Sequence, residues 1–334
     1  MFRLILRKKD LFFAPFSNRH KTYFIPFAEA EIKVFSTEEF EQESSLGIRQ
    51  NYHVENQDKV AYLDLLQKSI TALKQSKLQK VVLSRQIKVR EVQFSEAFLV
   101  HTFQQLVATY PDAFTYVFYH PDEGFWMGAT PEQLISTERN WLTKVALAGT
   151  QLYNGTTQVT WGNKEDQEQQ YVVDAILEVL EGNCTRISTS DKYTKKAGNL
   201  LHLNTDIKAS FELEKLQDIV NELHPTPAVC GLPKEKAREF ILQNENYDRR
   251  YYTGYLGEIN YPNQKQRRQK SRNQEHQVIK QIIPTTQLFV NLRCMHLREN
   301  NLDVFVGGGI TAESQPESEW QETEHKSKTM LKVL

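Results

Sequence analysis

The chain has 334 residues, of which 40% are hydrophobic and 25% are charged. Its 41 basic and 42 acidic residues give a formal net charge of −1. These values are ordinary for a globular protein, and they exclude a disordered, highly charged chain. They also exclude a nucleic-acid binder that depends on an overall positive charge, so we expect no nucleic-acid partner.

The cysteines and the apolar runs indicate a cytoplasmic protein. Cys184, Cys230 and Cys294 are too few and too scattered for a disulfide framework, which favours free thiols in a reducing compartment. No apolar run approaches the roughly 18 residues of a membrane helix. Charged residues at 7–10 interrupt the apolar start of the chain, so we expect no signal peptide and no contact with a membrane.

The N-terminal part of the chain predicts short strands, one helix and one longer strand. Residues 1–50 alternate apolar runs with polar breaks and contain an acidic stretch at 38–43. Residues 58–76 carry apolar side chains at helical spacing and predict an amphipathic helix. Residues 78–90 predict a strand with Lys80 on its polar face.

The middle and the end of the chain predict strands in meanders followed by helices. We expect helices at 95–110, 164–181, 209–222, 233–243 and 317–331. We expect a four-stranded meander at 114–119, 125–128, 133–137 and 141–147, and a last hairpin at 288–297 and 302–306. This order favours an α+β fold over alternating βαβ units.

Residues 261–287 form a polar segment with six basic residues and a single glutamate. We expect a long mobile loop between two strands, because added loop length costs little entropy. The alternative is a patch that binds an anionic partner.

Two pairs of glutamates, each spaced by three residues, lie near the starts of predicted helices. They are Glu165 with Glu168, and Glu319 with Glu322. Such pairs usually complement a helix dipole on a solvated surface. The alternative is a cation site, since two carboxylates about 4 Å apart repel by roughly 4 kcal/mol at an effective dielectric near 20. Ligands that are all oxygen favour Mg²⁺.

Four other features carry possible chemistry. Lys80 either reaches solvent or lines a cavity as a base. Glu132, between two predicted strands, is either an exposed loop acid or a positioned general acid. The segment HPTPAVCG (224–231) is rigid and irregular because of its two prolines. The glycines at 307–309 either let backbone N–H groups approach an anion or form the exit of a hairpin.

The ordered set of motifs resembles the chorismate-utilising enzymes, most closely the isochorismate synthases, from about residue 60 to the C-terminus. The motifs are KVVLSR (80–85), GATPEQL (128–134), LAGT (147–150), KEDQE (164–168), HPTPAVCGLP (224–233), YYTGYLG (251–257), LRCMHLREN (292–300), VGGGIT (306–311) and EWQETEHK (319–326).

The resemblance implies a single large α+β domain over 1–334, with two antiparallel β-sheets packed as a sandwich and helices on the outside. Residues 1–55 match only loosely as N-terminal strands, residues 56–334 form the catalytic core, and 261–287 is a polar, mobile insertion. Relatives of this kind are commonly monomers.

The resemblance also implies an isomerase that interconverts chorismate and isochorismate by moving a ring hydroxyl from C4 to C2, with Mg²⁺ as its cofactor. Lys80 matches the base that activates water at C2, and Glu132 matches the acid that protonates the leaving C4 hydroxyl. The metal ligands would be Glu168 and Glu322 directly, and Glu165 and Glu319 through water. Substrate-binding roles are implied for Gly149, Thr150, Thr226, Ala228, Tyr252, Arg293, Gly308 and Lys326. Isochorismate feeds menaquinone, siderophore and salicylate pathways.

Three positions bear on the choice within this family. Lys80 favours water over an amine as the nucleophile, since the amine-transferring members generally lack this lysine. Ala228 stands where anthranilate and salicylate synthases usually carry threonine, which favours an enzyme that stops before pyruvate elimination. A salicylate synthase and a non-catalytic chorismate-binding protein remain the alternatives. Gln169 replaces a histidine found in many relatives, which can alter support around the metal ligands.

Overall fold

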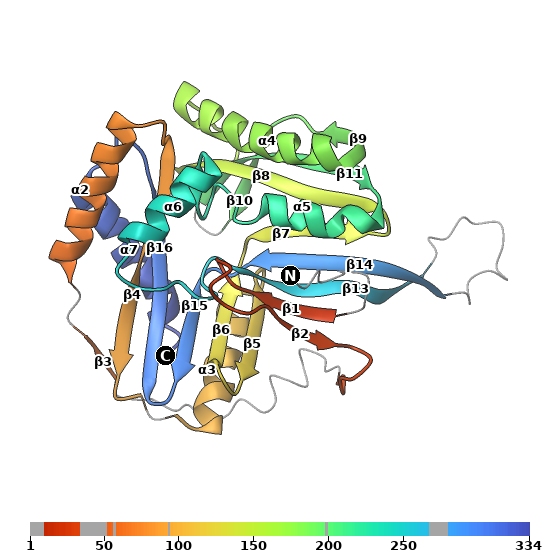
Figure 1. The fold of residues 1–334 in the computed structure, drawn as a ribbon, viewed down its shortest axis with the longest axis horizontal. Helices are drawn as coiled ribbons and strands as arrows, with labels where there is room; N and C mark the ends of the chain where they lie inside the picture. The colour runs from red at the N-terminus through yellow and green to blue at the C-terminus, as the bar shows by residue number, and fades with distance from the viewer. Residues whose placement is uncertain (1–9, 34–51, 56–57, 93, 198–199, 267–279) are drawn as a thin grey trace.

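The computed structural model describes residues 10–33, 52–55, 58–92, 94–197, 200–266 and 280–334. Within these residues, nine strands form one antiparallel sheet and seven form another (Figure 1). The strands of the larger sheet are β1 (Asp10–Ala14), β2 (Tyr23–Pro26), β7 (Gln133–Glu138), β8 (Trp141–Leu152), β9 (Cys184–Thr189), β10 (Tyr193–Ala197), β11 (Leu200–Phe211), β13 (Tyr255–Gln266) and β14 (Lys280–Val290). Their order is β10-β11-β8-β7-β14-β13-β1-β2, with β9 beside β11.

The smaller sheet has the order β12-β4-β16-β15-β6-β5, with β3 beside β4. Its strands are β3 (His53–Val54), β4 (Lys80–Arg90), β5 (Phe114–His120), β6 (Gly124–Thr130), β12 (Gly231–Leu232), β15 (Cys294–Arg298) and β16 (Asn301–Ile310). The strands of the two sheets run in different directions in Figure 1.

Helices cover the outer faces of both sheets. They are α2 (Lys59–Gln75), α3 (Glu96–Thr109), α4 (Asn163–Asn183), α5 (Leu216–Leu223), α6 (Lys234–Asn244) and α7 (Pro316–Leu331), with a short 3₁₀ turn at Leu213–Lys215. α4 and α5 pack on the larger sheet, α2, α6 and α7 on β4 and β16, and α3 on β5 and β6. No helix in the described part of the chain is long and apolar enough to cross a membrane.

An aromatic cluster joins the two sheets. Phe13 of β1 stacks on Phe118 of β5 with ring centroids 4.4 Å apart, and on Tyr251 at 4.5 Å. Trp126 of β6 meets Tyr251 edge to face at 5.6 Å. These rings are all buried, and pairs of this kind contribute about 0.5–1.5 kcal/mol beyond the area they bury. The expected α+β sandwich with outer helices is therefore confirmed.

The chain crosses between the sheets at two short connections that the sequence did not predict. β6 ends at Thr130 in the smaller sheet, and β7 begins at Gln133 in the larger one, so the expected four-stranded meander is split in two. The expected strand 288–297 is also wrong, because β14 ends at Val290 and β15 belongs to the other sheet. Asn291 fixes this second crossing, since its side-chain nitrogen donates to the carbonyl of Tyr251 at 2.9 Å.

The predicted loop at 261–287 is wrong at both of its ends. β13 continues to Gln266 and β14 starts at Lys280, and these strands pair from Tyr261 with Thr285 to Gln266 with Lys280. Residues 267–279 lie outside the described residues. The polar side chains in 261–266 and 280–287 thus belong to a long hairpin, which an alternating polar pattern permits.

Helix boundaries agree with the sequence where the helices are amphipathic. α2, α4, α6 and α7 match the predicted segments within two residues. The helix predicted at 209–222 is wrong at its start, because β11 continues to Phe211. β9, β10 and β11 were not predicted at all. The acidic stretch 38–43 lies outside the described residues, and the assignment of 1–334 to one domain stays a prediction.

Candidate active site

Three consecutive glycines in β16 make room for the site. Gly307, Gly308 and Gly309 do not exit a hairpin, as the sequence analysis considered, but pair with β4 inside the sheet. A β-carbon on Gly309 would lie 2.9 Å from Cε of Lys80, near the flexible end of that side chain. At Gly307 a β-carbon would lie 2.7 Å from the backbone carbonyl oxygen of Leu83, so this close approach of two strands requires glycine in a strand interior, where it is otherwise disfavoured.

Lys80 begins β4 and reaches across to helix α4. Its Nζ donates to Oε1 of Glu168 at 3.5 Å, and its side chain is 20% exposed. Gly309 lies directly beneath this lysine. The predicted base and one predicted metal ligand, which are 88 positions apart in the sequence, therefore meet in space.

Helix α7 places its two predicted acids over the next glycine. A β-carbon on Gly308 would lie 3.6 Å from Oε2 of Glu319 and 3.7 Å from Oε1 of Glu322. Lys326, one helical turn after Glu322, pairs with Oε1 of Glu322 at 2.5 Å and donates to the carbonyl of Gly307 at 2.9 Å. Gly308 and Gly309 are adjacent in β16, and successive β-carbons of a strand point to opposite faces, so the acids of α7 and Lys80 approach this strand from its two sides.

Arg85 holds α7 in this position, and sequence reasoning did not identify it. Its guanidinium lies over the indole ring of Trp320 at 4.1 Å, and Nε donates to Oγ1 of Thr323 at 2.8 Å. It also forms an ion pair with Glu324. Since Arg85 lies on the same strand as Lys80, these contacts tie the helix that carries Glu322 to the strand that carries the base.

The first turn of α4 lies against strand β8. Glu165 packs beside Gly149, whose β-carbon would be 3.1 Å from Cβ of the glutamate, and Gly149 has a φ of +70° that favours glycine. Oε2 of Glu165 lies over Gly162, the residue before the helix. The predicted metal-water ligand is therefore folded back over the start of its own helix.

The donor chemistry around Gly308 and Gly309 suits Mg²⁺, which prefers carboxylate oxygens and water. Glu168 and Glu322 have side chains 45% and 48% exposed, so their oxygens can reach an incoming ion. In the structure they are paired with Lys80 and Lys326 instead. Among the described residues, no group of three or more His, Cys, Asp or Glu side chains is gathered closely enough to hold a metal ion.

Glu132 lies at the first crossing between the sheets. Its carbonyl accepts a hydrogen bond from the N–H of Val290 at 2.9 Å, and its N–H donates to Oγ1 of Thr130 at 3.3 Å. Oγ1 of Thr226 donates to the Glu132 carboxyl at 3.3 Å. The backbone and the carboxyl are thus both fixed, which a loop acid exposed to solvent would not need.

The surroundings of Glu132 favour its protonated form. Burial raises the pKa of its carboxyl above the ordinary value, and Lys144, the Thr226 hydrogen bond and Lys80 each oppose that rise. Because the charge of Lys80 acts on Glu132, the predicted acid and the predicted base share one electrostatic environment.

The predicted carboxylate-binding residues differ in exposure. Arg293, in the connection between β14 and β15, has an exposed side chain and a φ of +46°. Tyr252 is buried, and its hydroxyl would lie 3.1 Å from a β-carbon on Gly307. It lies in the turn before β13 and not in a strand. Thr150 is in β8, opposite His202, and its side chain lies outside the described part of the structure.

His202 is a site residue that sequence reasoning missed. Its Nδ1 lies 3.2 Å from the carbonyl oxygen of Gly149. Burial lowers the pKa of its ring, and the positive charge of Arg293 lowers it further. His202 therefore lies close to two predicted substrate-binding residues. The segment that contains it was not predicted as a strand, so nothing linked it to Gly149.

Arg249 ties the HPTPAVCG segment to strand β4 of the smaller sheet. Arg249 donates to the carbonyl of Val82 at 2.6 Å and to that of Val229 at 3.0 Å. Its buried partner is Glu245, at 2.6 Å. Within the segment Thr226 is buried, whereas Ala228 is exposed.

Gln169 is a buried polar residue of α4 that contacts the larger sheet. Gln169 is fully buried, and its Nε2 donates to Oγ1 of Thr205 at 2.8 Å. Its amide thus ties α4 to β11 directly behind Glu168. The substitution of glutamine for histidine at this position keeps a side-chain donor toward the sheet.

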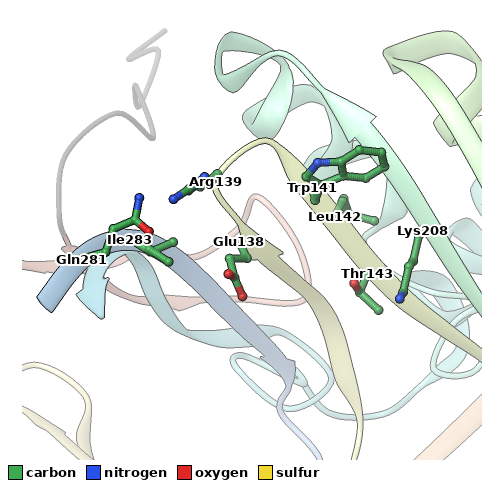
Figure 2. A pocket seen from close by; sticks show the side chains of 8 residues that line it. All are labelled: Glu138, Arg139, Trp141, Leu142, Thr143, Lys208, Gln281 and Ile283. Atoms are coloured by element: carbon green, nitrogen blue, oxygen red, sulfur yellow. The ribbon is translucent and has the colours of Figure 1, made fainter. Parts of the chain in front are cut away.

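A surface pocket of about 520 Å³ lies away from these residues, at the turn between β7 and β8 (Figure 2). It is lined by Glu138, Arg139, Trp141, Leu142, Thr143, Lys208, Gln281 and Ile283. None of the predicted site residues lines this pocket. The pocket is therefore not part of the candidate active site.

Comparison with known families agrees with the motifs. The model of a family described as chorismate binding enzyme matches residues 18–266. A second model with the same description matches residues 284–332. Together they include every predicted catalytic, substrate-binding and metal-binding residue.

Comparison with single proteins gives several similar chains. The vibriobactin-specific isochorismate synthase of Vibrio cholerae is 30% identical over 77% of this chain and 62% of its own length. Isochorismate synthase DhbC of Bacillus subtilis is 28% identical over 62% of this chain and 50% of its own. The chain therefore spans between half and two-thirds of these relatives. The solved structure of MenF, the menaquinone-specific isochorismate synthase from Escherichia coli, has the same fold, with a TM-score of 0.71 at 22% identity over 85% of this chain and 63% of that one.

Proposed function

Because this chain belongs to the family of chorismate binding enzymes, we propose that it is an isochorismate synthase, an isomerase that converts chorismate into isochorismate with Mg²⁺ as its cofactor. The observation that carries the proposal is the position of Lys80, which contacts Glu168 and acts electrostatically on Glu132. The base thus contacts one carboxylate ligand of the proposed site and acts electrostatically on the acid.

Lys80 is the base in this proposal. Water is a poor nucleophile at neutral pH, so it needs a group that takes its proton as it attacks C2 of the ring. The new C2–O bond forms as the two conjugated double bonds of the ring shift and the C4–O bond breaks. Lys80 is only 20% exposed, and Gly309 leaves the space in which its amine can meet the water.

Glu132 is the acid. Hydroxide leaves poorly, so the oxygen departing from C4 must receive a proton as its bond breaks. Burial raises the pKa of the Glu132 carboxyl and thereby keeps more of it protonated. One water is consumed at C2 and one leaves from C4, so the product is an isomer of the substrate.

Glu168 and Glu322 would hold Mg²⁺ directly, and Glu165 and Glu319 would hold its water molecules. When bound, the ion would neutralise and orient a carboxylate of the substrate. Lys80 and Lys326 would give up their present carboxylate partners to it. Lys326 would then be free to donate to the substrate from the edge of Gly307.

Arg293 would bind the second carboxylate of the substrate. An exposed arginine can donate two parallel hydrogen bonds to a carboxylate, which fixes its orientation. His202, near Gly149 and Arg293, would lie beside the same substrate. Ala228 has no hydroxyl to offer, which supports a reaction that ends before pyruvate is eliminated.

The test is product identification from chorismate, with Mg²⁺ present and then chelated. We expect isochorismate to form only with Mg²⁺. Accumulation of salicylate with an equal amount of pyruvate would establish the salicylate synthase instead, and no turnover of chorismate would refute the enzyme.

Lys80→Ala tests the base directly, and Lys77→Ala is its matched control because Lys77 is exposed three residues earlier. We expect the first variant to lose at least roughly 10²-fold in turnover and the second to keep it. Equal rates in the two variants would remove Lys80 from the mechanism.

A further inference from the structure

Lys144 is a buried lysine that the proposed mechanism does not use. It lies in β8 with 6% of its surface exposed, and its neighbours on that face of the sheet, Leu142 and Ala146, are fully buried. Its register partner in β11 is Ile207, which is also fully buried. An ammonium group in such surroundings costs several kcal/mol unless polar groups meet it.

The ammonium group lies at the place where β7 separates from β8. The pairing of these strands covers only Ser136 with Thr143, Thr137 with Leu142 and Glu138 with Trp141. Beyond Ser136 the ladder provides no backbone donor for β7, and Nζ of Lys144 donates to the carbonyl of Gln133 at 2.9 Å. The side chain of Lys144 therefore links β8 to β7 beyond the last backbone pair of these two strands.

Gln133 directly follows Glu132, so this bond fixes the peptide next to the acid. Lys144 is also the first charged group that opposes the rise of the pKa of Glu132, ahead of Lys80. The groups that face the Glu132 carboxyl are thus Lys144 from β8, Lys80 from β4 and the hydroxyl of Thr226. Lys144 is a buried residue of the sheet that contains β7, whereas Lys80 belongs to the other sheet and Thr226 to the connection before β12.

We propose that Lys144 is a positioning residue, which holds the turn at Gln133 and sets the charge environment of Glu132 from behind. Its kinetic consequence rests on the proposed function, in which Glu132 is the acid. Its structural content does not depend on turnover, because it concerns the titration of one carboxyl in the free protein.

Two neutral variants separate charge from packing. Lys144→Met removes the charge and the donor, whereas Lys144→Gln removes the charge and keeps an amide N–H. Loss of the positive charge should raise the titration midpoint of Glu132 by roughly one pH unit in both variants. Lys208→Met is the control, since Lys208 pairs with Thr143 next to Lys144 in the sheet but is exposed on the opposite face.

The measurement is the pH titration of the glutamate side-chain carbons by ¹³C NMR, with the Glu132 signal assigned by its absence in Glu132→Gln. We expect the higher midpoint in Lys144→Met and Lys144→Gln, and the wild-type midpoint in Lys208→Met. A wild-type midpoint in Lys144→Gln, or an equal shift in Lys208→Met, would overturn the proposal. If only Lys144→Gln folds, its midpoint decides alone.

The kinetic prediction follows from the same change. With chorismate as substrate, kcat should fall by roughly 10-fold while KM changes little, because a misplaced acid affects bond breaking and not binding. The pH at which the rate falls on the alkaline side of the profile should rise together with the titration midpoint of Glu132. Shifted titration without any turnover in the wild type would support the positioning role and refute the proposed function.

Discussion

A carboxyl can deliver a proton near neutral pH only where its surroundings disfavour the carboxylate. Glu132 meets this condition because it is half-buried at the crossing between two sheets, where desolvation raises its pKa. Thr226 and Lys144 limit the effect, so the acid can still lose its proton during the reaction. The balance between burial and these polar neighbours is what makes this residue suited to act as an acid.

Glu132→Gln tests this role at the level of one atom. The amide keeps the size of the side chain but has no acidic proton, so we expect turnover to fall by roughly 10²-fold or more with little change in KM. Glu138→Gln, at the exposed end of the strand β7 that follows Glu132, is the control and should keep its rate. Wild-type turnover in Glu132→Gln would exclude this residue as the acid.

The raised pKa of Glu132 also has a consequence for stability. The folded protein holds the proton more tightly than the unfolded chain, so this contribution is complete below the unfolded pKa of about 4.3 and is lost as the pH rises through the folded pKa. Wild-type protein should therefore lose stability relative to Glu132→Gln as the pH rises from the unfolded pKa of about 4.3 through the folded pKa. Thermal unfolding of both proteins at several pH values measures this difference, and a constant difference would contradict the raised pKa.

Site residues that lie in a sequence motif could be predicted. Site residues whose role depends on contacts with distant parts of the chain could not. The motifs pointed to Lys80 and Glu168, and the structure brings the two into contact. Lys144 has no motif, because its role depends on a strand pairing that ends early. His202 was missed for a similar reason, since its partner Gly149 is 53 positions away.

At the scale of elements, α7 packs on β16 and α2, and Arg85 of β4 adds a polar anchor to it. Arg85 of β4 contacts Trp320, Thr323 and Glu324 in two successive turns of the helix. The Arg85 side chain is only 8% exposed, whereas its partner Glu324 is 36% exposed. Glu319 directly precedes the anchored residues and Glu322 lies between Trp320 and Thr323, so the direction of both acids follows from the anchor.

Arg85→Met should therefore destabilise the protein by about 1.5 to 3 kcal/mol, because it removes the hydrogen bonds of a largely buried guanidinium to Thr323 and Glu324. Denaturant unfolding measures this loss. The control is Lys59→Ala, which removes an ion pair to Glu317 on the same helix; both partners are exposed, so we expect at most about 1 kcal/mol. Equal losses in the two variants would show that Arg85 is no anchor.

Element types could be predicted where the pattern is local. Helices α2 and α7 have apolar faces that are legible in the sequence, and both were predicted within two residues. β11 was missed because its sequence, LLHLNTDIKASF, does not alternate cleanly. The glycines of β16 were compatible with a hairpin exit, because the close approach of the Leu83 carbonyl oxygen to Gly307 depends on a strand pairing that the sequence does not show.

At the scale of the whole molecule, the sheet to which a strand belongs was not predictable. β6 and β7 are separated by two residues and resemble a hairpin, yet they belong to different sheets. Their partners, β15 and β14, pair with them across 147 to 172 positions of the chain. Only the family resemblance indicated two stacked sheets, because pairings over such distances leave no local pattern.

Mg²⁺ should stabilise the whole protein if the four glutamates hold it. A ligand that binds only the folded state adds about 2.7 kcal/mol at 100 times its dissociation constant, so the Tm should rise with Mg²⁺ concentration. Glu322→Ala should lose most of this rise. Glu317→Ala, exposed on the first turn of α7, is the control and should keep it. An undiminished rise in Glu322→Ala would remove that residue from the ligand set.

The contact between Lys80 and Glu168 joins a strand of the smaller sheet to a helix that packs on the larger one. The relative orientation of the two sheets therefore sets the distance between the proposed base and this proposed metal ligand. A substitution in the aromatic cluster, such as Phe13→Leu, would change that orientation without touching any group near the ring. Hydrostatic pressure, which compresses the space between layers, should likewise slow the reaction before the protein unfolds. The packing that stacks the sheets is in this sense also the part of the molecule that sets reaction geometry.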